Sequence, residues 1–391
     1  MIVKIKQIAE NIYDEIVAIR RHLHKNPELS FKEYKTSAYI KFVLNSWNIP
    51  YTEDIANTGI VVLLSGNNPN SKIIALRADF DALPITEENK IDFCSVNSGV
   101  MHACGHDAHT ASLLGTINIL NTLKKEWEGS IKFIFQPAEE MLPGGAKQMI
   151  NEGVLENPNV EKMLGQHVFP DLEVGKVGFR PGKYMASTDE LYITIKGKGG
   201  HAALPENYNN PLIVAAKIIT ALDEYSKSKK DMPCVLAIGF IEALGSTNVI
   251  PDKVKLKGTL RVMDEDFRIN THEKMLAITN SIAETFSLTI NFEIRKGYPC
   301  LVNDEELTEK AITLAKEYLG AENVIDLPMR MTAEDFAYYS QVMPACFYRL
   351  GTASADGSNS FGVHNSTFNI DESALFIGAG LMAYQAYKKL K

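Results

Sequence analysis

Apolar residues recur at helical spacing in some segments of the chain and fill short extended segments in others. Near the start, Ile8, Ile12, Ile16 and Ile19 fall on one helical face. The pattern predicts helices over residues 3–25, 31–46 and about 108–125, and strands over 60–64, 73–76 and 131–135. Strands that alternate with helices indicate an α/β sheet covered by helices. In such sheets, functional residues gather on loops at the carboxyl ends of the strands.

The pattern changes after residue 182. Strand, helix, strand, strand, helix and strand are predicted at 191–197, 211–228, 234–241, 253–263, about 266–286 and 288–294. This βαββαβ order is typical of a ferredoxin-like domain. Helices near 303–319 and 373–390 and a strand at 346–350 then restore the α/β character. We therefore predict a larger α/β domain with a mixed sheet, residues 1–182 and 297–391, and an inserted domain, residues 183–296.

Charge and composition narrow the class of protein. The 391 residues carry a formal net charge of −8, with no basic block of the kind that nucleic-acid binding needs. No apolar run approaches the roughly 20 residues that span a bilayer, so we expect neither nucleic acid nor membrane as a partner. Five cysteines without a repeating spacing do not form a disulfide framework. A cytoplasmic enzyme or binding protein is the expectation.

The segment MHACGHDAH, residues 101–109, is the richest in potential metal ligands. Cys104 and His106 are two positions apart, so in an extended loop their side chains can point the same way. A thiolate and an imidazole suit zinc, cobalt, nickel or manganese. Taken alone, these histidines could equally cap the following helix or lie hydrogen-bonded in the core.

A second cluster follows the apolar strand 131–135, where Gln136 and Pro137 lead into Glu139 and Glu140. Neighbouring side chains leave an extended backbone in opposite directions, so the two carboxylates are expected to differ in role. One could bind a metal ion while the other takes a proton from a water. A solvated acidic turn is the alternative.

Two more histidines and two aspartates complete the candidate set. His167 ends a short apolar run, and His364 lies in a polar loop before the last helix. Asp79 and Asp81 follow a predicted strand, where they could orient ligand histidines or cap a turn. Together these side chains supply enough ligands for two metal ions. Of the remaining histidines, His272 is expected on an exposed helix face.

Eight motifs in one order make the sequence recognisable: LRADFDALPITEE, MHACGHDAHT, FQPAEE with GGAKQMI, GQHV, GKGGHAALP, NVIPD, AEDF and VHNS. This order resembles the metal-dependent amidohydrolases that include bacterial hippurate hydrolase, N-acyl-amino-acid deacylases, acetyl-diaminopimelate deacetylase and plant auxin-conjugate hydrolases. The resemblance covers nearly the whole chain. It differs at Glu206, where these enzymes commonly have histidine, and this difference bears on substrate preference.

The resemblance implies a role for each site residue. The ligands of two divalent metal ions per subunit (manganese, zinc, cobalt or nickel) would be Cys104, His106, Glu140, His167 and His364. Glu139 would be the general base. The inserted domain would be a lid and dimerisation surface, with His201 reaching across a homodimer to stabilise the oxyanion. Asn248 and Arg261 would bind the carboxylate of the substrate.

The activity implied is hydrolysis of the amide bond of an N-acyl amino acid, with an acetyl, benzoyl or similar acyl group. A dipeptidase or carboxypeptidase of the same family is an alternative. A cysteine amidase that uses Cys104 has the residues but leaves Glu139, Glu140, His167 and His364 without a purpose. A structural zinc protein would prefer several cysteines in a closed site.

Overall fold

The computed structural model describes residues 1–229, 232–357, 359 and 361–389, and the chain forms two compact units. The large unit comprises Met1–Gly182, Val302–Pro328 and Asp335–Lys391; the small unit comprises Lys183–Leu301 and Met329–Glu334. Among the helices of the described ranges, none has both the length and the apolar character needed to cross a membrane.

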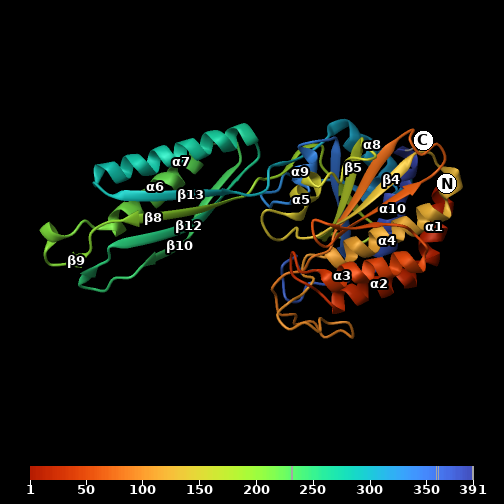
Figure 1. Cartoon of the computed structure of the whole chain (residues 1–391), viewed down its shortest axis with the longest axis horizontal. Coiled ribbons are helices and arrows are strands. Elements are labelled where there is room, and N and C mark those ends of the chain that lie inside the picture. Colours follow the sequence, from red (N-terminus) through yellow and green to blue (C-terminus); the bar gives the residue numbers. More distant parts are fainter. Residues whose placement is uncertain (230–231, 358, 360, 390–391) are drawn as a thin grey trace. The chain divides into compact units, whose positions relative to one another are not determined.

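The large unit is built on a mixed eight-stranded sheet (Figure 1). In spatial order its strands are β1 (Thr52–Ile55), β2 (Gly59–Ser65), β4 (Ser130–Gln136), β3 (Ile73–Asp79), β5 (Lys162–Glu173), β16 (Ala345–Ala353), β6 (Val177–Phe179) and β15 (Val324–Asp326). The central strands β4, β3, β5 and β16 run parallel, while β1 pairs with β2, β2 with β4, and β16 with β6 in antiparallel register. The predicted mixed α/β sheet is confirmed.

Helices cover this sheet. They are α1 (Ile2–Asn11), α2 (Tyr13–Lys25), α3 (Tyr34–Ser46), α4 (His106–Thr122), α5 (Gly145–Asn151), α8 (Glu305–Leu319), α9 (Ala337–Ser340) and α10 (Ala374–Lys389), with 3-10 turns η1 (Lys124–Glu126) and η3 (Ala321–Asn323). Helices α4 and α10 pack together, and α1 and α2 contact them (Figure 1). Strand β3 is buried throughout: Ile74 and Leu76 join the main core, while Arg77, on the opposite face, bonds to Asp335.

The small unit has the predicted βαββαβ order. Its elements are β8 (Asp189–Lys196), β9 (Gly200–His201), η2 (Pro205–Asn207), α6 (Pro211–Lys227), β10 (Cys234–Ala243), β11 (Val249–Ile250), β12 (Lys253–Val262), α7 (Glu265–Thr285) and β13 (Thr289–Lys296). The antiparallel sheet has the order β10-β12-β8-β13, which is the ferredoxin-like arrangement. Leu191, Ile193 and Ile195 alternate along β8 and bury one face of the sheet beneath α6 and α7. Strands β7 (Gly182–Met185) and β14 (Leu301–Asn303) lie where the chain passes between the units.

Several details differ from the sequence prediction. The inserted domain was predicted over 183–296, whereas the small unit extends to Leu301 and also includes Met329–Glu334. The helix predicted over 3–25 is two helices, because the chain leaves helical geometry at Ile12. The helix predicted from residue 31 begins at Tyr34, since Phe31 has a positive φ of 64°. His272 was expected to be exposed, and this was wrong: it is buried on α7 and lies 2.6 Å from Asp189. The predicted helix 373–390 includes Leu390, which lies outside the described residues.

Candidate dinuclear metal centre

The candidate site residues of the large unit lie where central strands of the sheet end. Strand β3 ends at Asp79, β4 ends at Gln136 just before Glu139 and Glu140, and β5 contains His167. His106 is the first residue of α4. Because β3, β4 and β5 are parallel, their carboxyl ends meet at one edge of the sheet.

Gly105 allows Cys104 and His106 to approach β5. Its φ of 82° is in the left-handed region, which glycine adopts without strain. A Cβ at this position would lie 2.4 Å from Val168 Cγ2, so any side chain would collide with β5. Cys104 directly precedes this residue and the α4 N-terminus. The helix dipole there favours a thiolate, but burial outweighs it and raises the pKa of the Cys104 thiol.

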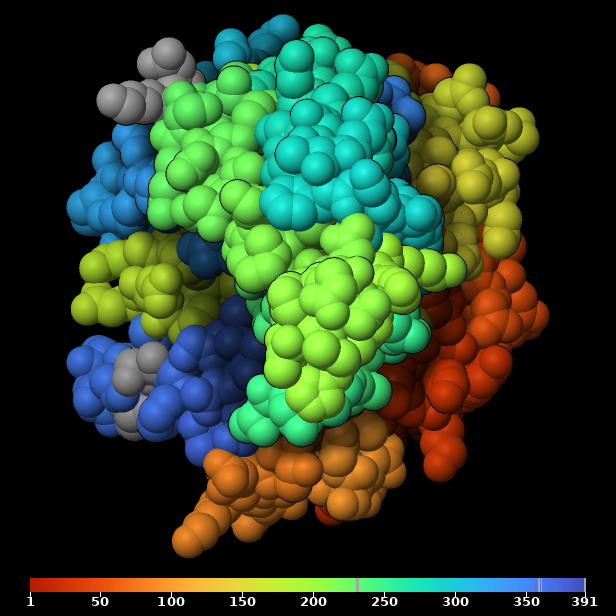
Figure 2. Space-filling model, turned by 90° about the vertical axis from the view of Figure 1, so that its left-hand side faces the viewer, coloured from red at the N-terminus to blue at the C-terminus, as the bar shows by residue number. Residues whose placement is uncertain are grey.

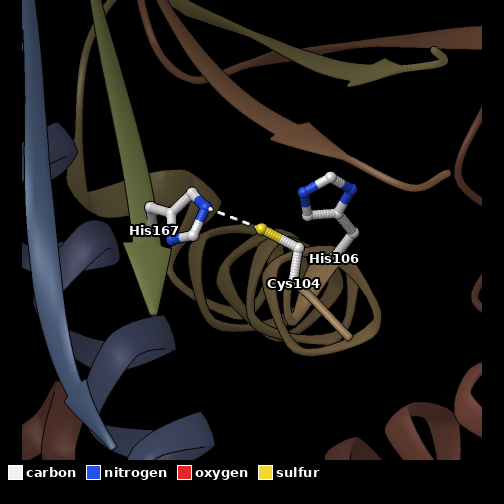
Figure 3. Close-up of side chains that lie close together, drawn as sticks. All are labelled: Cys104, His106 and His167. Carbon is white, nitrogen blue, oxygen red and sulfur yellow. Dashed lines mark hydrogen bonds between the residues drawn. The ribbon is translucent and has the colours of Figure 1, made fainter. Parts of the chain in front are cut away.

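The structure brings all six predicted residues of the large unit together. The Cys104 sulfur lies 3.5 Å from His167 Nε2 and beside the His106 ring (Figure 3). Potential ligand atoms lie within 4.8 Å of one another in three overlapping groups: Cys104, His106 and His167; Cys104, Glu140 and His364; and His106, Glu139 and Glu140. Five of the six residues are more than half buried, and the His364 side chain is 50% exposed. One face of the cluster is therefore accessible from outside.

Hydrogen bonds to backbone carbonyls orient two of the histidines. His106 Nδ1 lies 2.9 Å from the Asp81 carbonyl oxygen, and His167 Nδ1 lies 2.7 Å from that of Val168. A carbonyl oxygen can only accept, so both Nδ1 atoms carry the proton. In the neutral rings each Nε2 then has its lone pair available toward the cluster.

Unsatisfied polar atoms show that the cluster fits metal ions. Among the described residues, His106 Nε2 and Glu140 Oε1 are buried without a hydrogen bond, although His364 Nε2 forms an ion-pair contact of 3.2 Å with this same Glu140 oxygen. Buried polar atoms are almost always satisfied, so these two point to a missing partner. Contact with Cys104, and then with Glu140, raises the pKa of His364 to about 10. A place that favours a protonated imidazole also favours a metal cation, and mixed sulfur, nitrogen and oxygen donors suit several divalent metals.

Asp79 and His109 also lie close to His106, but they are occupied by other contacts. The His109 ring donates from Nδ1 to Asp79, at 2.6 Å, and accepts the Val168 N–H at Nε2, at 2.8 Å. With both ring nitrogens used, His109 holds β5 beside His167. Arg77 occupies the other Asp79 oxygen at 2.6 Å.

Asp81 supports two of the candidate ligands. One carboxylate oxygen lies 3.1 Å from His106 Nδ1; the other accepts the Glu140 N–H at 3.0 Å and the Ser30 hydroxyl at 2.6 Å. Burial by itself would raise the pKa of Asp81, but the contact with His106 and the other donors lower it below its usual value. Asp81 thus remains an acceptor that fixes its neighbours, one of the two roles considered for it from the sequence.

Four supporting residues, Glu33, Asp107, Arg20 and His24, were not predicted to contribute to the site. Glu33 is fully buried behind the turn that contains Glu139, and burial, followed by the charge of Asp81, raises its pKa to about 7. On the far side of His106, the Asp107 carboxylate receives Arg20 at 2.9 Å and His24 at 2.8 Å. These partners are distant in sequence, so no local pattern connects them. The RRHLH segment at residues 20–24 was their only signal.

The remaining predicted residues lie in the small unit. His201 in β9 pairs with Val249 in β11, and the Ala202 N–H donates to the Asn248 carbonyl at 3.0 Å, so His201 and Asn248 are neighbours. His201 and Asn248 are both exposed. The stretch of chain near residue 200, drawn in yellow-green in Figure 2, lies at the surface of the small unit. Arg261 lies on β12, and burial lowers the pKa of its guanidinium.

Comparison with known proteins identifies the family. Residues 75–387 match the family described as Peptidase family M20/M25/M40. The chain belongs to this family. The M20 enzymes are hydrolases, so family membership confirms the prediction that the chain is a metal-dependent amidohydrolase.

Relatives within the M20 family cover most of the chain. The N-acetyl-L-cysteine deacetylase of Bacillus subtilis is 38% identical over 378 residues, 96% of this chain and 88% of the relative. The N-acyl-L-amino acid amidohydrolase of Geobacillus stearothermophilus is 39% identical over 305 residues, 78% and 82% of the two chains. Thermostable carboxypeptidase 2 of Saccharolobus solfataricus is 35% identical over 393 residues, 99% and 98%.

A solved structure of an M20 relative matches the fold. The Bacillus subtilis YXEP protein, described as a dinuclear metal binding peptidase from the M20 family, is 34% identical and has a TM-score of 0.85 over 97% of this chain and 99% of that one. Family membership and this neighbour indicate a centre for two metal ions. In the described part of the large unit, the cluster of Cys104, His106, Glu140, His167 and His364 has side chains that fit such a centre.

Proposed function

We propose that the chain hydrolyses the amide bond of N-acyl amino acids and releases a carboxylic acid and a free amino acid. The observation that supports this most is the cluster of Cys104, His106, Glu140, His167 and His364, with Glu139 beside it. Relatives named as an N-acyl-L-amino acid amidohydrolase and as N-acetylcysteine deacetylases support the same substrate class.

The five clustered side chains are the proposed ligands of two divalent ions, with manganese, zinc, cobalt and nickel as candidates. Bound there, such ions would polarise the scissile carbonyl and lower the pKa of a water. Asp81 and the Val168 carbonyl fix the ligand rings, so the chain itself determines which lone pairs face the ions. His364, whose side chain is half exposed, is the fifth proposed ligand.

Glu139 is the proposed general base. It is 6% exposed, its carboxylate lies near His106 and Glu140, and Glu139 Oε1 receives the Asp335 N–H at 3.4 Å. From this position Glu139 would take a proton from the attacking water and return it to the leaving amine. Glu140 would be a metal ligand.

The small unit supplies the proposed substrate contacts. His201 would stabilise the oxyanion, and Asn248 and Arg261 would bind the carboxylate of the amino-acid half. In the wider family such a histidine acts across a dimer, and we propose a homodimer here too. The edge strand β10 supports this, because exposed Phe240, Ile241 and Leu244 lie on it or directly after it.

Two other activities are weighed against this one. A carboxypeptidase would use the same centre, and relatives named thermostable carboxypeptidases favour it. A Cys104 amidase is disfavoured, because Cys104 is 7% exposed and burial raises the pKa of its thiol, which lowers the thiolate fraction.

We also propose that the enzyme is cytoplasmic, in line with its five free cysteines.

The test is hydrolysis of a panel by the purified protein: N-acetyl-methionine, N-acetyl-cysteine, hippurate, N-acetyl-diaminopimelate and a dipeptide. Each substrate is assayed after chelation and after manganese, zinc, cobalt or nickel is added back. We expect release of amine from an N-acyl amino acid that is lost with chelator and restored by metal. Preference for the dipeptide would favour the carboxypeptidase, and cleavage that resists chelation would favour Cys104.

A further inference from the structure

The turn 137–144, between β4 and α5, places Glu139 and Glu140 at the candidate metal centre. Ala138, directly before Glu139, has a φ of 52°. A residue with a Cβ rarely adopts this left-handed conformation, and it persists only where its surroundings enforce it. The direction in which the Glu139 side chain leaves the turn therefore depends on whatever holds Ala138.

Glu33 holds Ala138 from behind. One oxygen of the Glu33 carboxylate accepts the N–H groups of Ala138 and Phe31, both at 2.9 Å, and the other accepts the Thr58 hydroxyl at 2.9 Å. The Glu33 side chain is fully buried, so water does not compete for these bonds.

Other hydrogen bonds hold the rest of the turn and the carbonyl of Ala138. The Gly145 N–H donates to the Ala138 carbonyl at 3.0 Å, and a Cβ on Gly145 would lie 1.8 Å from the Pro137 oxygen. Asp335 accepts from Gln136 Nε2 at 2.8 Å and from the Ala146 N–H at 3.0 Å. Glu33 therefore holds the N–H of Ala138, before the proposed base, while Gly145 holds the carbonyl of Ala138 and Asp81 accepts the Glu140 N–H at 3.0 Å after it.

We propose that Glu33 is a positioning residue for Glu139: its carboxylate keeps Ala138 in the left-handed conformation and so aims the Glu139 carboxylate. This rests on the proposed function of Glu139 as the base. Without Glu33, the Ala138 N–H loses its acceptor, and the left-handed conformation keeps only the hydrogen bond from Gly145 to the Ala138 carbonyl. A misplacement of about 1 Å can cost ~100-fold in rate, so the effect falls on kcat.

Three variants test this. Glu33→Ala removes the acceptor. Glu33→Gln keeps an oxygen for both N–H groups, and the Thr58 hydroxyl can rotate to accept from its NH₂ group. The matched control is Glu28→Ala: Glu28 Oε2 accepts the Thr36 N–H at 2.8 Å and the Thr36 hydroxyl at 3.0 Å, in the same stretch of chain but away from the turn.

We expect Glu33→Ala to lower kcat ~10- to 100-fold, with KM within about threefold and the metal content unchanged. Glu33→Gln and Glu28→Ala are expected to keep kcat within about threefold. Crystal structures of the variants provide a readout independent of activity: in Glu33→Ala the Ala138 φ changes and the Glu139 carboxylate moves, and in Glu33→Gln neither does.

An unmoved Glu139 and an unchanged kcat in Glu33→Ala would overturn the inference. So would a loss of kcat explained by lost metal, or a Glu33→Gln variant as slow as Glu33→Ala, since charge would then matter more than the hydrogen bonds. The proposed function fails separately, if Glu139→Gln retains the parental kcat. The crystal structures report on Glu33 in either case.

Discussion

Each unit of the molecule contains a buried cluster of histidine and carboxylate, and the two clusters differ in whether their polar atoms are satisfied. In the small unit, Asp189 receives His272 at 2.6 Å, Arg268 at 2.5 and 3.0 Å, and the Gly297 N–H at 3.3 Å. Both Asp189 oxygens are occupied. Burial would raise the pKa of Asp189, but its bonds to His272 and Arg268 outweigh burial and lower it.

In the large unit, among the described residues, His106 Nε2 and Glu140 Oε1 are buried without a hydrogen bond, and Glu140 Oε1 has an ion-pair contact of 3.2 Å with His364 Nε2. Residue types alone do not separate these two clusters, since both combine histidine with acidic side chains. The difference lies in the lone pairs: a cluster that satisfies itself stabilises a fold, and one that leaves lone pairs open is suited to binding a cation. The predictions that follow test this contrast, from the largest effect to the smallest.

Removing a histidine should have opposite consequences in the two clusters. We expect His106→Ala to lose bound metal and to lower kcat by ~10³-fold or more, because a ligand is removed. His272→Ala should keep the parental metal content and lose only stability. Elemental analysis and steady-state kinetics on both variants check this. Equal metal content in the two variants would remove His106 from the ligand set.

The adjacent glutamates should separate in the same way. Glu139→Gln is expected to retain metal and to lower kcat ~10²- to 10⁴-fold, the range for loss of a general base. Glu140→Gln should lower the metal content, because Glu140 is a proposed ligand. Metal content and kcat are measured on the same preparations. If the two variants behave alike, the assignment of different roles is wrong.

Asp189→Asn tests the self-satisfied cluster. It removes the more buried of the two carboxylates that bind Arg268 and leaves only Glu265, and breaking such a buried pair typically costs ~3–5 kcal/mol. Denaturant unfolding should show the loss, while the metal content of the folded protein stays at the parental value. If the free energy of unfolding changes by no more than the ~0.5 kcal/mol of an ordinary surface substitution, the cluster contributes little to stability.

The smallest effect concerns Glu33 and pH. Its pKa rises from 4.5 to about 7 on folding, so below pH 4.5 both states are protonated and the burial penalty is absent. Between pH 4.5 and 7 the unfolded chain loses this proton first, and Glu33 destabilises the fold increasingly as pH rises. Glu33→Gln removes the titration, so its stability relative to the parent should increase by about 2–3 kcal/mol between pH 4.5 and 8. A stability difference independent of pH would contradict the raised pKa.

The sequence predicted the fold well where periodicity was strong. Alternating apolar residues in 191–195 and the helices around them led directly to the βαββαβ order. The break at Ile12 was not predicted, because neither proline nor glycine marks it. The positive φ of Phe31 and the start of α3 at Tyr34 were also not predicted. The conformation of this segment depends on the hydrogen bond between Glu33 and Ala138, which lies more than 100 positions away in the sequence.

The residues of the candidate site also divide into those that local sequence patterns predict and those that only the tertiary fold brings together. Cys104, His106, Glu139 and Glu140 were predicted because short motifs place chemically distinctive side chains together, and the structure brings them together. His167 and His364 were recognised only through the family resemblance. The supporting contacts, such as Arg77 with Asp335 and His24 with Asp107, join segments 258 and 83 positions apart. No local pattern encodes such pairs, since they depend on how strands and helices pack.

The most direct test of the central claim is anomalous diffraction from crystals of the protein loaded with manganese. If the open lone pairs of the large unit form a dinuclear centre, two anomalous peaks will lie within coordination distance of Cys104, His106, Glu140, His167 and His364, and none at Asp189 and His272. The absence of peaks at the first cluster, or a peak at the second, would contradict the account.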